Sequence, residues 1–289
     1  MPIADDYKFS IYFPSPELSP YIQYYGVFEF KNIEDGLMIQ EIVPTNLSAI
    51  NFISAENTFY SRQNGSPFLP LSSASLVGHI TQKVYNKIIG TGSGVVVIFT
   101  SYGLFRLFGI NMHELTNAVE DAADFICTRE ITECRQKLFE IQNIKEKISV
   151  IESFLLKTLH KSCFELRGID KIIDFIQLRK GNVGIEWLSN QANMSFKTFE
   201  RHFDKKIGIS PKLYADITRF SNAVKMLSFQ KNISAILNQC GYTDHAHMIK
   251  EFRKFTGDTP RHFYKENDEL SDYFLNPLAK NDENLQFSE

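Results

Sequence analysis

The stretch that decides the C-terminal fold is GYTDHAHMIKEFRKFTGDTP, residues 241–260. It contains two histidines one residue apart, His245 and His247, which could bind one metal ion on a strand because residues i and i+2 share a face. On a helix the two side chains lie about 200° apart and cannot share an ion. Met248 and Phe252 are apolar residues four apart, the spacing of a buried helix face. The stretch therefore predicts a helix whose histidines diverge, and no metal site is expected there.

The same pattern occurs twice, so the C-terminal region contains an internal repeat. At an offset of 49 residues the corresponding pairs are Phe199 and Met248, Arg201 and Lys250, Phe203 and Phe252, Lys205 and Lys254, Gly208 and Gly257, Pro211 and Pro260, and Tyr214 and Phe263. Asn193 and Gly241 correspond at an expected tight turn, where a left-handed backbone favours Gly or Asn. Ser195, and Thr243 or Asp244, are good N-caps for the helix that follows. Each copy predicts a helix-turn-helix motif, whose second helix enters a DNA major groove.

Charge is divided unevenly along the chain. From Arg167 to Lys265 there are 17 Lys and Arg against 9 Asp and Glu, whereas the remaining residues carry 14 against 25. The first segment therefore has a net charge of +8, although the whole chain has a net charge of −3. A basic block in an otherwise acidic protein indicates a polyanionic partner, of which double-stranded DNA is the simplest.

About the first 110 residues have a different pattern, with short apolar or alternating runs separated by turn formers. These runs are YIQYYGVFEF, LMIQEIVP, LSAINFIS, ASLVGHIT and GVVVIFTS. Aromatic and β-branched residues at this spacing are typical of antiparallel strands, and SYGLFRLFG predicts a short helix after the last of them. From about Ile131 to His160 apolar residues recur every three or four positions, so a helical connector is expected next.

Together these patterns predict an α+β protein with four parts. They are a mostly antiparallel β-domain at residues 1–130, a helical connector at 131–166, an all-α domain with two helix-turn-helix motifs at 167–265, and an acidic tail at 266–289. The N-terminus lacks the pattern of a secretion signal, and the longest apolar run, Val95 to Phe99, is too short to span a membrane. The four cysteines form no CxxC pair, which favours reduced thiols. A cytoplasmic protein without membrane association is expected.

The basic block resembles the tandem helix-turn-helix domain of AraC/XylS-type transcription regulators. The resemblance rests on GYTDHAHMIKEFRKFTGDTPRHFY, residues 241–264, which is close to the family signature, and on RFSNAVKMLSF from Arg219, which resembles the family's linking helix. It covers about one third of the chain. The chain departs from the family pattern with Asn193 at the usual turn glycine, Met248 at an aromatic position, and Lys250 at an arginine. Lys250 cannot give the bidentate base recognition of arginine, so a phosphate contact is the alternative at that position.

Helical geometry and the resemblance together indicate which residues contact DNA. The predicted base contacts are Lys197, Glu200, Arg201, His245, Ile249 and Lys250. The predicted phosphate contacts are Ser195, Lys205, Lys206, Arg253 and Lys254. Arg201 is the strongest candidate because a guanidinium can bind guanine O6 and N7 together, and Ile249 could pack on a thymine methyl group. The two motifs of one monomer would then occupy two successive turns of the major groove.

The N-terminal runs resemble the cupin-like sensor domains that precede this DNA-binding domain in many bacterial regulators. That resemblance implies a small-molecule effector, a homodimer, or both. An effector pocket would be lined by aromatic side chains of the strands, and no single residue stands out as effector-binding. Only His79 and His113 precede the connector, and no nucleotide-binding or nucleophile motif is present, so neither a metal nor a cofactor is predicted.

Two alternatives stay open on the sequence. One is an enzyme, in which a cupin-like or DNA-repair catalytic domain is fused to the same DNA-binding module. It would need a catalytic cluster near the N-terminus, where the sequence offers none. The other is an N-terminal domain that serves only as an interaction scaffold. The leading prediction is a non-enzymatic, sequence-specific transcription regulator, with its effector, its operator and the choice of activation or repression left open.

Overall fold

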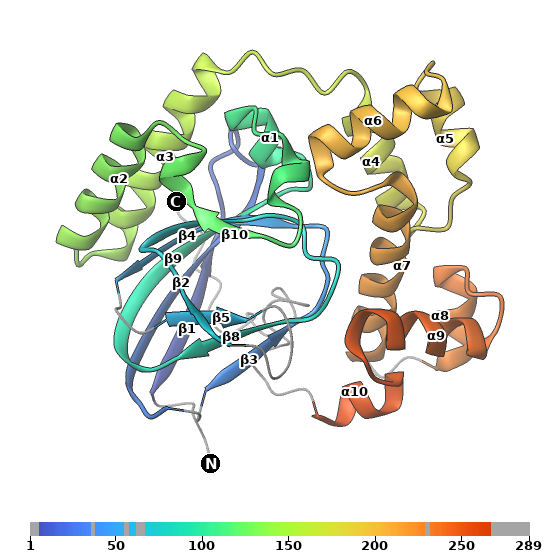
Figure 1. Cartoon of the computed structure of the whole chain (residues 1–289), viewed down its shortest axis with the longest axis horizontal. Coiled ribbons are helices and arrows are strands. Elements are labelled where there is room, and N and C mark those ends of the chain that lie inside the picture. Colours follow the sequence, from blue (N-terminus) through green and yellow to red (C-terminus); the bar gives the residue numbers. More distant parts are fainter. Residues whose placement is uncertain (1–5, 36–37, 55–57, 62–66, 229–231, 267–289) are drawn as a thin grey trace.

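The computed structural model of the chain describes residues 6–35, 38–54, 58–61, 67–228 and 232–266. Apart from its first residue, the predicted acidic tail lies outside the described residues. Strands occupy the N-terminal part and helices the remainder, so the predicted α+β class is confirmed (Figure 1). No helix in the described ranges is long and apolar enough to cross a membrane.

Two antiparallel sheets form the N-terminal domain. The described strands of the larger sheet are, in spatial order, β1 (Tyr7–Tyr12), β2 (Ile22–Ile33), β9 (Gly90–Phe99), β4 (Ser48–Ser54), β7 (Ala74–Val77) and β10 (Val119–Asp121). Those of the smaller sheet are β3 (Ile39–Ile42), β8 (Val84–Ile88), β5 (Thr58–Ser61) and β6 (Leu69–Pro70). All of these strand pairs are antiparallel, and the two sheets lie one above the other (Figure 1). The predicted antiparallel β-domain is therefore confirmed.

Strand β9 shows why its apolar run is continuous instead of alternating. Val95 and Val97 belong to the core on the helical side of the larger sheet, whereas Val96 and Ile98 line the space between the two sheets. Successive side chains point to opposite faces of a strand, so a strand that is covered on both faces needs apolar residues at every position. Both faces of the larger sheet are therefore covered by apolar residues, and the space on one face contains a cavity.

The helices that follow the strands cover the outer face of the larger sheet. They are α1 (Gly103–Phe108), the 3-10 helices η2 (Met112–Leu115) and η3 (Ala122–Asp124), α2 (Thr128–Glu140) and α3 (Ile144–Lys161). The helical segment predicted from Ile131 to His160 is present as two helices, because Asn143 starts a new one. Its side chain accepts hydrogen bonds from the backbone N–H groups of Lys145 and Glu146. The buried residues of both helices share one core with the sheet: Ile131, Cys134, Leu138, Ile151 and Leu155.

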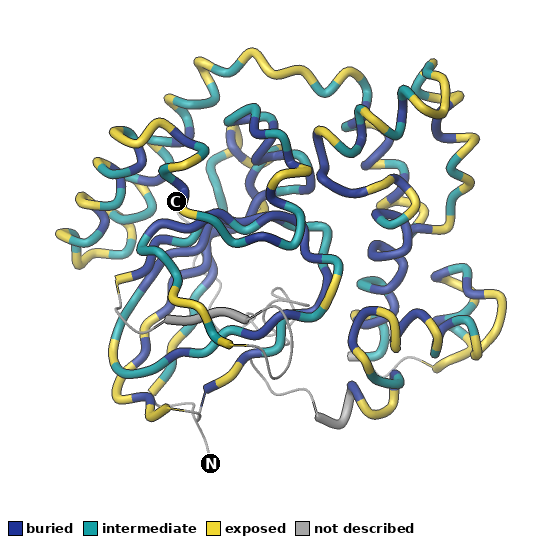
Figure 2. The backbone as a smooth tube through the Cα atoms, in the orientation of Figure 1, coloured by how far each residue is buried: buried dark blue, intermediate teal, exposed yellow. Residues whose placement is uncertain are grey.

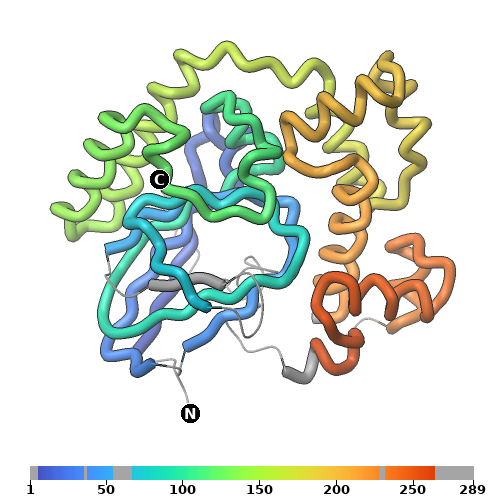
Figure 3. The backbone as a smooth tube through the Cα atoms, in the orientation of Figure 1, coloured from blue at the N-terminus to red at the C-terminus, as the bar shows by residue number. Residues whose placement is uncertain are grey.

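The C-terminal domain is entirely helical and has one continuous core. Its described helices are α4 (Ile169–Leu178), α5 (Ile185–Gln191), α6 (Phe196–Ile207), α7 (Pro211–Ser228), α8 (Ile233–Cys240), α9 (His245–Thr256) and α10 (Pro260–Glu266). Helix α7 contacts α4, α6 and α8, and buried residues follow it along most of its length (Figure 2). The chain reaches this domain through residues 162–168, a segment that passes from α3 to α4 (Figure 3).

Candidate DNA interface and effector cavity

The first helix-turn-helix motif is formed by α5 and α6. Asn193 in the turn has a φ of 50°, in the left-handed region that the turn prediction requires. The Ser195 hydroxyl accepts a hydrogen bond from the Thr198 backbone N–H at 3.3 Å and caps α6. Phe199 and Phe203 are fully buried and pack edge to face, with their ring centroids 5.7 Å apart. One side of α6 is thus anchored in the core, and the opposite side faces outward.

The second motif, formed by α8 and α9, repeats this construction. Gly241 in its turn has a φ of 71°, and the Asp244 carboxylate caps α9 by accepting a hydrogen bond from the His247 N–H at 2.7 Å. Met248 and Phe252 are fully buried, at the positions that correspond to the two buried phenylalanines of α6. The repeat in the sequence is therefore a repeat of structure.

The two histidines of the HAH stretch diverge, as predicted from their place on a helix. His245 is exposed. His247 is half-buried, with its Nδ1 3.2 Å from the Thr243 hydroxyl and its ring edge-on to Tyr242 at a centroid distance of 5.3 Å. Within the part of the chain that the structure describes, no group of three or more His, Cys, Asp or Glu side chains is arranged to hold a metal ion.

A buried ion-pair network ties α9 to α7. The Arg219 guanidinium donates hydrogen bonds to both carboxylate oxygens of Glu251 and, at 2.8 Å, to Asp216. The Tyr242 hydroxyl donates to Glu251 at 2.7 Å, and burial together with the charge of this carboxylate raises the pKa of Tyr242. Because α7 also packs against α6, the network fixes the second motif relative to the first.

Most of the predicted DNA contacts lie on the outward faces of the two motifs. Those that are exposed are Ser195, Lys197, Arg201, Lys205, His245, Lys250, Arg253 and Lys254, and those that are partly exposed are Glu200 and Ile249. The ammonium group of Lys254 lies 3.7 Å from the Asp216 carboxylate, so it is shared between solvent and α7. Access to solvent at these positions is what a groove-reading face requires.

Lys206 is an exception, and its predicted phosphate contact is wrong for this structure. The residue is 4% exposed, and its ammonium group donates a hydrogen bond to the Leu166 carbonyl at 2.5 Å. Burial and the nearby charge of Arg167 lower the pKa of Lys206. The physical reason is helical periodicity, because position 206 lies three residues after Phe203 and therefore on the same, inward face of α6.

The C-terminal end of α6 lies against the N-terminal domain, a contact that no sequence pattern indicated. His79 is fully buried, and its Nδ1 donates a hydrogen bond to the Ile207 carbonyl. His113 in η2 places its Nδ1 3.0 Å from the Asp204 carboxylate. The two histidines that precede the connector are therefore used separately, each to contact the first recognition helix, and not as a pair.

Gly208, which ends α6, fits this contact closely. Its φ is 89°, a left-handed conformation that favours glycine, and its carbonyl accepts a hydrogen bond from the Thr116 hydroxyl at 2.5 Å. A Cβ atom at this position would lie 2.5 Å from the Met112 carbonyl oxygen, far inside ordinary contact distance. Glycine at this position therefore has two effects. It allows the left-handed conformation that ends α6, and it leaves room for the N-terminal domain to pack against this helix end.

A second contact between the domains involves the start of α7. The Asn46 amide donates hydrogen bonds to the Tyr214 carbonyl at 3.0 Å and to the Thr218 hydroxyl at 2.7 Å. The Ser101 hydroxyl donates a hydrogen bond to the Asn46 carbonyl at 2.8 Å and lies 2.7 Å from the Tyr214 hydroxyl. The Tyr214 hydroxyl also accepts a hydrogen bond from the Gln177 side chain at 3.1 Å. Two separate loops of the β-domain are thus hydrogen-bonded to the helical domain.

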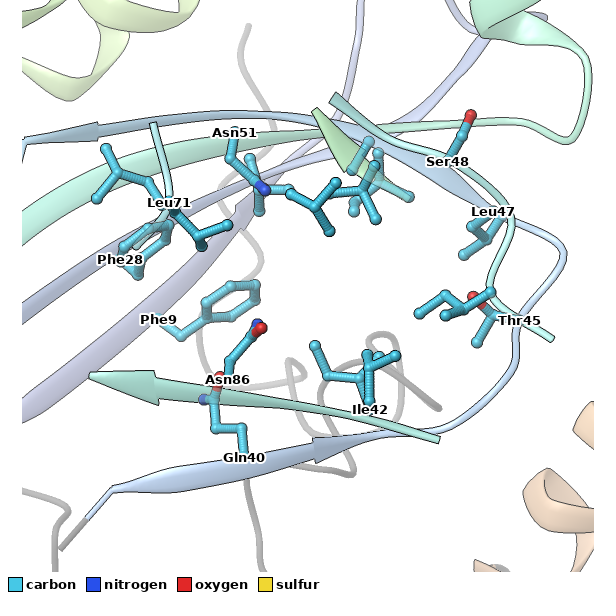
Figure 4. Close-up of a pocket in the computed structure, with 18 of the residues that line it drawn as sticks. Phe9, Phe28, Gln40, Ile42, Thr45, Leu47, Ser48, Asn51, Leu71 and Asn86 are labelled. Atoms are coloured by element: carbon cyan, nitrogen blue, oxygen red, sulfur yellow. The ribbon is translucent and has the colours of Figure 1, made fainter. Parts of the chain in front are cut away.

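A cavity of about 130 Å³ lies between the two sheets (Figure 4). Its wall is mainly aliphatic, with aromatic residues such as Phe9 and Phe28 at one end. The amide side chains of Gln40 and Asn86 reach it from the smaller sheet and that of Asn51 from the larger sheet. The expected aromatic lining is therefore present only in part. These amides carried no signal in the sequence, because polar residues on short strands are usually solvent-facing.

The matched pair of capped motifs, joined by α7, defines the class of the C-terminal domain. It is a tandem helix-turn-helix domain that resembles the AraC/XylS type, and residues 188–266 match the family described as a helix-turn-helix domain. Residues 10–121 match a domain of unknown function (DUF6597). The resemblance seen in the sequence is thereby confirmed.

Named relatives match part of the chain. The chain is 25% identical over 129 residues to the HTH-type transcriptional activator RhaS of Pectobacterium atrosepticum, which is 40% of this chain and 46% of that protein. It is 30% identical over 95 residues to an uncharacterized HTH-type transcriptional regulator of Haemophilus influenzae, which is 32% of each chain. The match therefore spans less than half the length of these relatives.

Among solved structures, ToxT from Vibrio cholerae aligns with a TM-score of 0.46 and 12% identity, over 89% of this chain and 97% of that one. The AraC-like transcriptional activator CuxR aligns with a TM-score of 0.25 and 10% identity, over 82% of this chain and 92% of that one.

Proposed function

We propose that the protein is a sequence-specific, DNA-binding transcription regulator whose N-terminal domain senses a small molecule. The observation that carries this proposal is the pair of matched recognition helices, each with polar residues facing outward, in a segment with a net charge of +8. Positive charge attracts the phosphate backbone, and side chains on the outward face read base edges. The relatives are named as regulators, which favours this function over the enzyme alternative, and RhaS is named as an activator, which favours activation.

The proposed DNA contacts follow from the outward residues of each motif. We assign base contacts to Lys197, Glu200, Arg201, His245, Ile249 and Lys250. We assign phosphate contacts to Ser195, Lys205, Arg253 and Lys254, and we leave out the buried lysine at the end of α6. Two helices fixed on one linking helix would enter two successive segments of the major groove.

We further propose that the cavity between the sheets is the effector site and that two loops report its occupancy. Asn46, which is hydrogen-bonded to α7, lies between Thr45 and Leu47, which line the cavity. His79, which is hydrogen-bonded to α6, lies beside the cavity-lining Ile80. A ligand that favours one arrangement of these loops shifts the population of domain arrangements, which is the requirement for a switch.

The order of the parts predicted from the sequence is kept in this proposal, but the helical connector predicted at residues 131–166 is divided. Because α2 and α3 share the core of the larger sheet, we assign them to the sensing unit and place the link to the DNA-binding unit in residues 162–168. A homodimer and a cytoplasmic location also belong to the proposal. Light scattering of the purified protein, with and without DNA, measures the first of these.

The test is binding of the full-length protein to a labelled duplex from the region upstream of its own gene. We expect tighter binding to this duplex than to a shuffled duplex of the same composition at physiological salt, with affinity falling steeply as salt rises. Arg201→Ala should weaken binding to the specific duplex by about 1–3 kcal/mol and relax the preference at one base position.

Lys145→Ala is the matched control, since it removes one positive charge from an exposed position on α3, far from the recognition helices. It should leave both the affinity and the base preference unchanged. Equal affinity for the upstream and shuffled duplexes would contradict the proposal, and selection from a random DNA pool then decides whether any sequence is preferred.

A further inference from the structure

Among the described residues, no charged side chain lines the cavity between the two sheets. Every described residue that lines it is apolar or carries a neutral hydroxyl or amide, and none is Asp, Glu, Lys, Arg or His. An ion buried in such a space has no opposite charge to compensate for its lost hydration. Carboxylates, phosphates and ammonium compounds are therefore poor candidates for this cavity.

Two lining residues, Gln40 and Ser48, carry a buried polar atom that has no hydrogen-bond partner among the described residues, and the Ser48 hydroxyl points away from the cavity (Figure 4). Gln40 is 6% exposed, and its Nε2 has no hydrogen-bond partner among the described residues. Across the strand pair, Gln40 lies directly opposite Asn86, and both side chains extend from the smaller sheet toward the cavity (Figure 4). Buried donors without a partner are rare because their lost hydration is not replaced, so this amide is suited to bind an acceptor oxygen of a ligand.

The opposite wall is different. Asn51, on β4 of the larger sheet, also points into the cavity, but its amide already donates to the Ser75 hydroxyl at 3.3 Å. Ala49 and Ile98 lie on the same wall and present only methyl and methylene groups. A ligand would thus be held by an amide at one side and by apolar contacts at the other.

The size of the cavity limits the ligand further. At about 130 Å³ it is close to the engineered apolar cavity of about 150 Å³ that binds benzene. A sugar of similar size would leave several hydroxyl groups without partners against the aliphatic wall, which excludes polyhydroxylated compounds.

From these observations we propose that the cavity binds a small neutral compound of one-ring size that carries a carbonyl oxygen, with Gln40 donating to that oxygen. This inference rests on the proposed sensing function and names the ligand class of that site. The apolar part of the ligand lies against the larger sheet, beside the loop that contains Asn46, so its binding is placed where the β-domain contacts α7.

The experiment compares four probes on the full-length protein at pH 7: benzamide, benzoate, ethylbenzene and glucose. Isothermal titration and thermal unfolding are followed for each probe, since a ligand of the folded state raises Tm. We expect binding of benzamide at least tenfold tighter than that of benzoate, which has the same shape but carries a charge. Ethylbenzene should bind more weakly than benzamide, and glucose should not bind.

Two variants locate the binding. Gln40→Leu should weaken the binding of benzamide at least tenfold and leave the affinity for ethylbenzene unchanged. Gln142→Leu is the same substitution at an exposed position between α2 and α3, and it should change neither affinity. Ala49→Leu fills the cavity from the larger sheet and should abolish binding of both compounds. Its Tm without probe reports whether it folds.

The proposal is overturned if benzoate binds as tightly as benzamide, if Gln40→Leu leaves the benzamide affinity unchanged, or if no neutral probe binds. Binding of the upstream duplex is measured with the same preparation. If DNA binding persists while the probes fail, only the ligand assignment falls. If benzamide binds while the duplex does not, the regulator function falls and the cavity assignment stands.

Discussion

At the residue scale, two adjacent lysines of α6 have opposite environments. Lys205 is exposed, whereas Lys206 is buried and hydrogen-bonded to the Leu166 carbonyl. Both were expected to contact phosphates because they lie in the basic last turn of a recognition helix. The face that each residue occupies separates them, since 206 shares the face of Phe203 and 205 does not.

This difference predicts different salt dependences for the two lysines. Lys205→Ala should remove one phosphate contact and reduce the slope of log K against log salt by about 1. Lys206→Met removes the ammonium group, keeps most of the side chain and should leave that slope unchanged. Anisotropy titrations at four salt concentrations measure both slopes, and an unchanged slope for Lys205→Ala would remove it from the interface.

At the scale of elements, the position of α9 depends on one buried charge pair. Glu251 accepts hydrogen bonds from both Arg219 and Tyr242, and all three residues are buried. The sequence indicated α9 and two candidates for its cap, Thr243 and Asp244, because caps and apolar spacing are local features. It did not indicate this pair, because its members are separated by 32 positions and meet only when α9 packs against α7.

Glu251→Gln should therefore destabilise the protein by about 3–5 kcal/mol, since it leaves the Arg219 guanidinium buried without its main counter-charge. Urea unfolding measures this loss. Glu133→Gln is the matched control, because Glu133 pairs with Arg129 on the exposed surface of α2, and its loss should destabilise the protein far less than the loss of Glu251. Similar losses for the two variants would show that the buried network contributes little.

At the scale of the whole molecule, the two copies of the motif are placed differently. Gly208 and Gly257 end corresponding helices with φ values of 89° and 83°. A Cβ atom at Gly257 would meet nothing within 4 Å, whereas one at Gly208 would collide with the Met112 carbonyl of the N-terminal domain. The N-terminal domain therefore contacts the first motif through a helix end that is exposed in the second.

The repeat supplies its own control for this contact. Gly257→Ala should cost about 1 kcal/mol, the ordinary penalty of a left-handed alanine. Gly208→Ala should lower the free energy of unfolding by more, because the added methyl group must also displace the N-terminal domain. Urea unfolding compares the two losses, and small-angle scattering compares the domain arrangements. Equal losses with unchanged scattering would mean that the domains do not press on this glycine.

The sequence by itself determined the repeat, the caps, the buried faces of α6 and α9, and the antiparallel β-domain. Each of these depends on spacing within a few residues, where side-chain periodicity and backbone preference act directly. Only the tertiary structure decided that Lys206 is hydrogen-bonded to Leu166, that His79 contacts α6, and that Gln40 faces a cavity without charge. These features depend on segments far apart in the chain coming together, and short-range patterns of charge and apolarity do not encode that proximity.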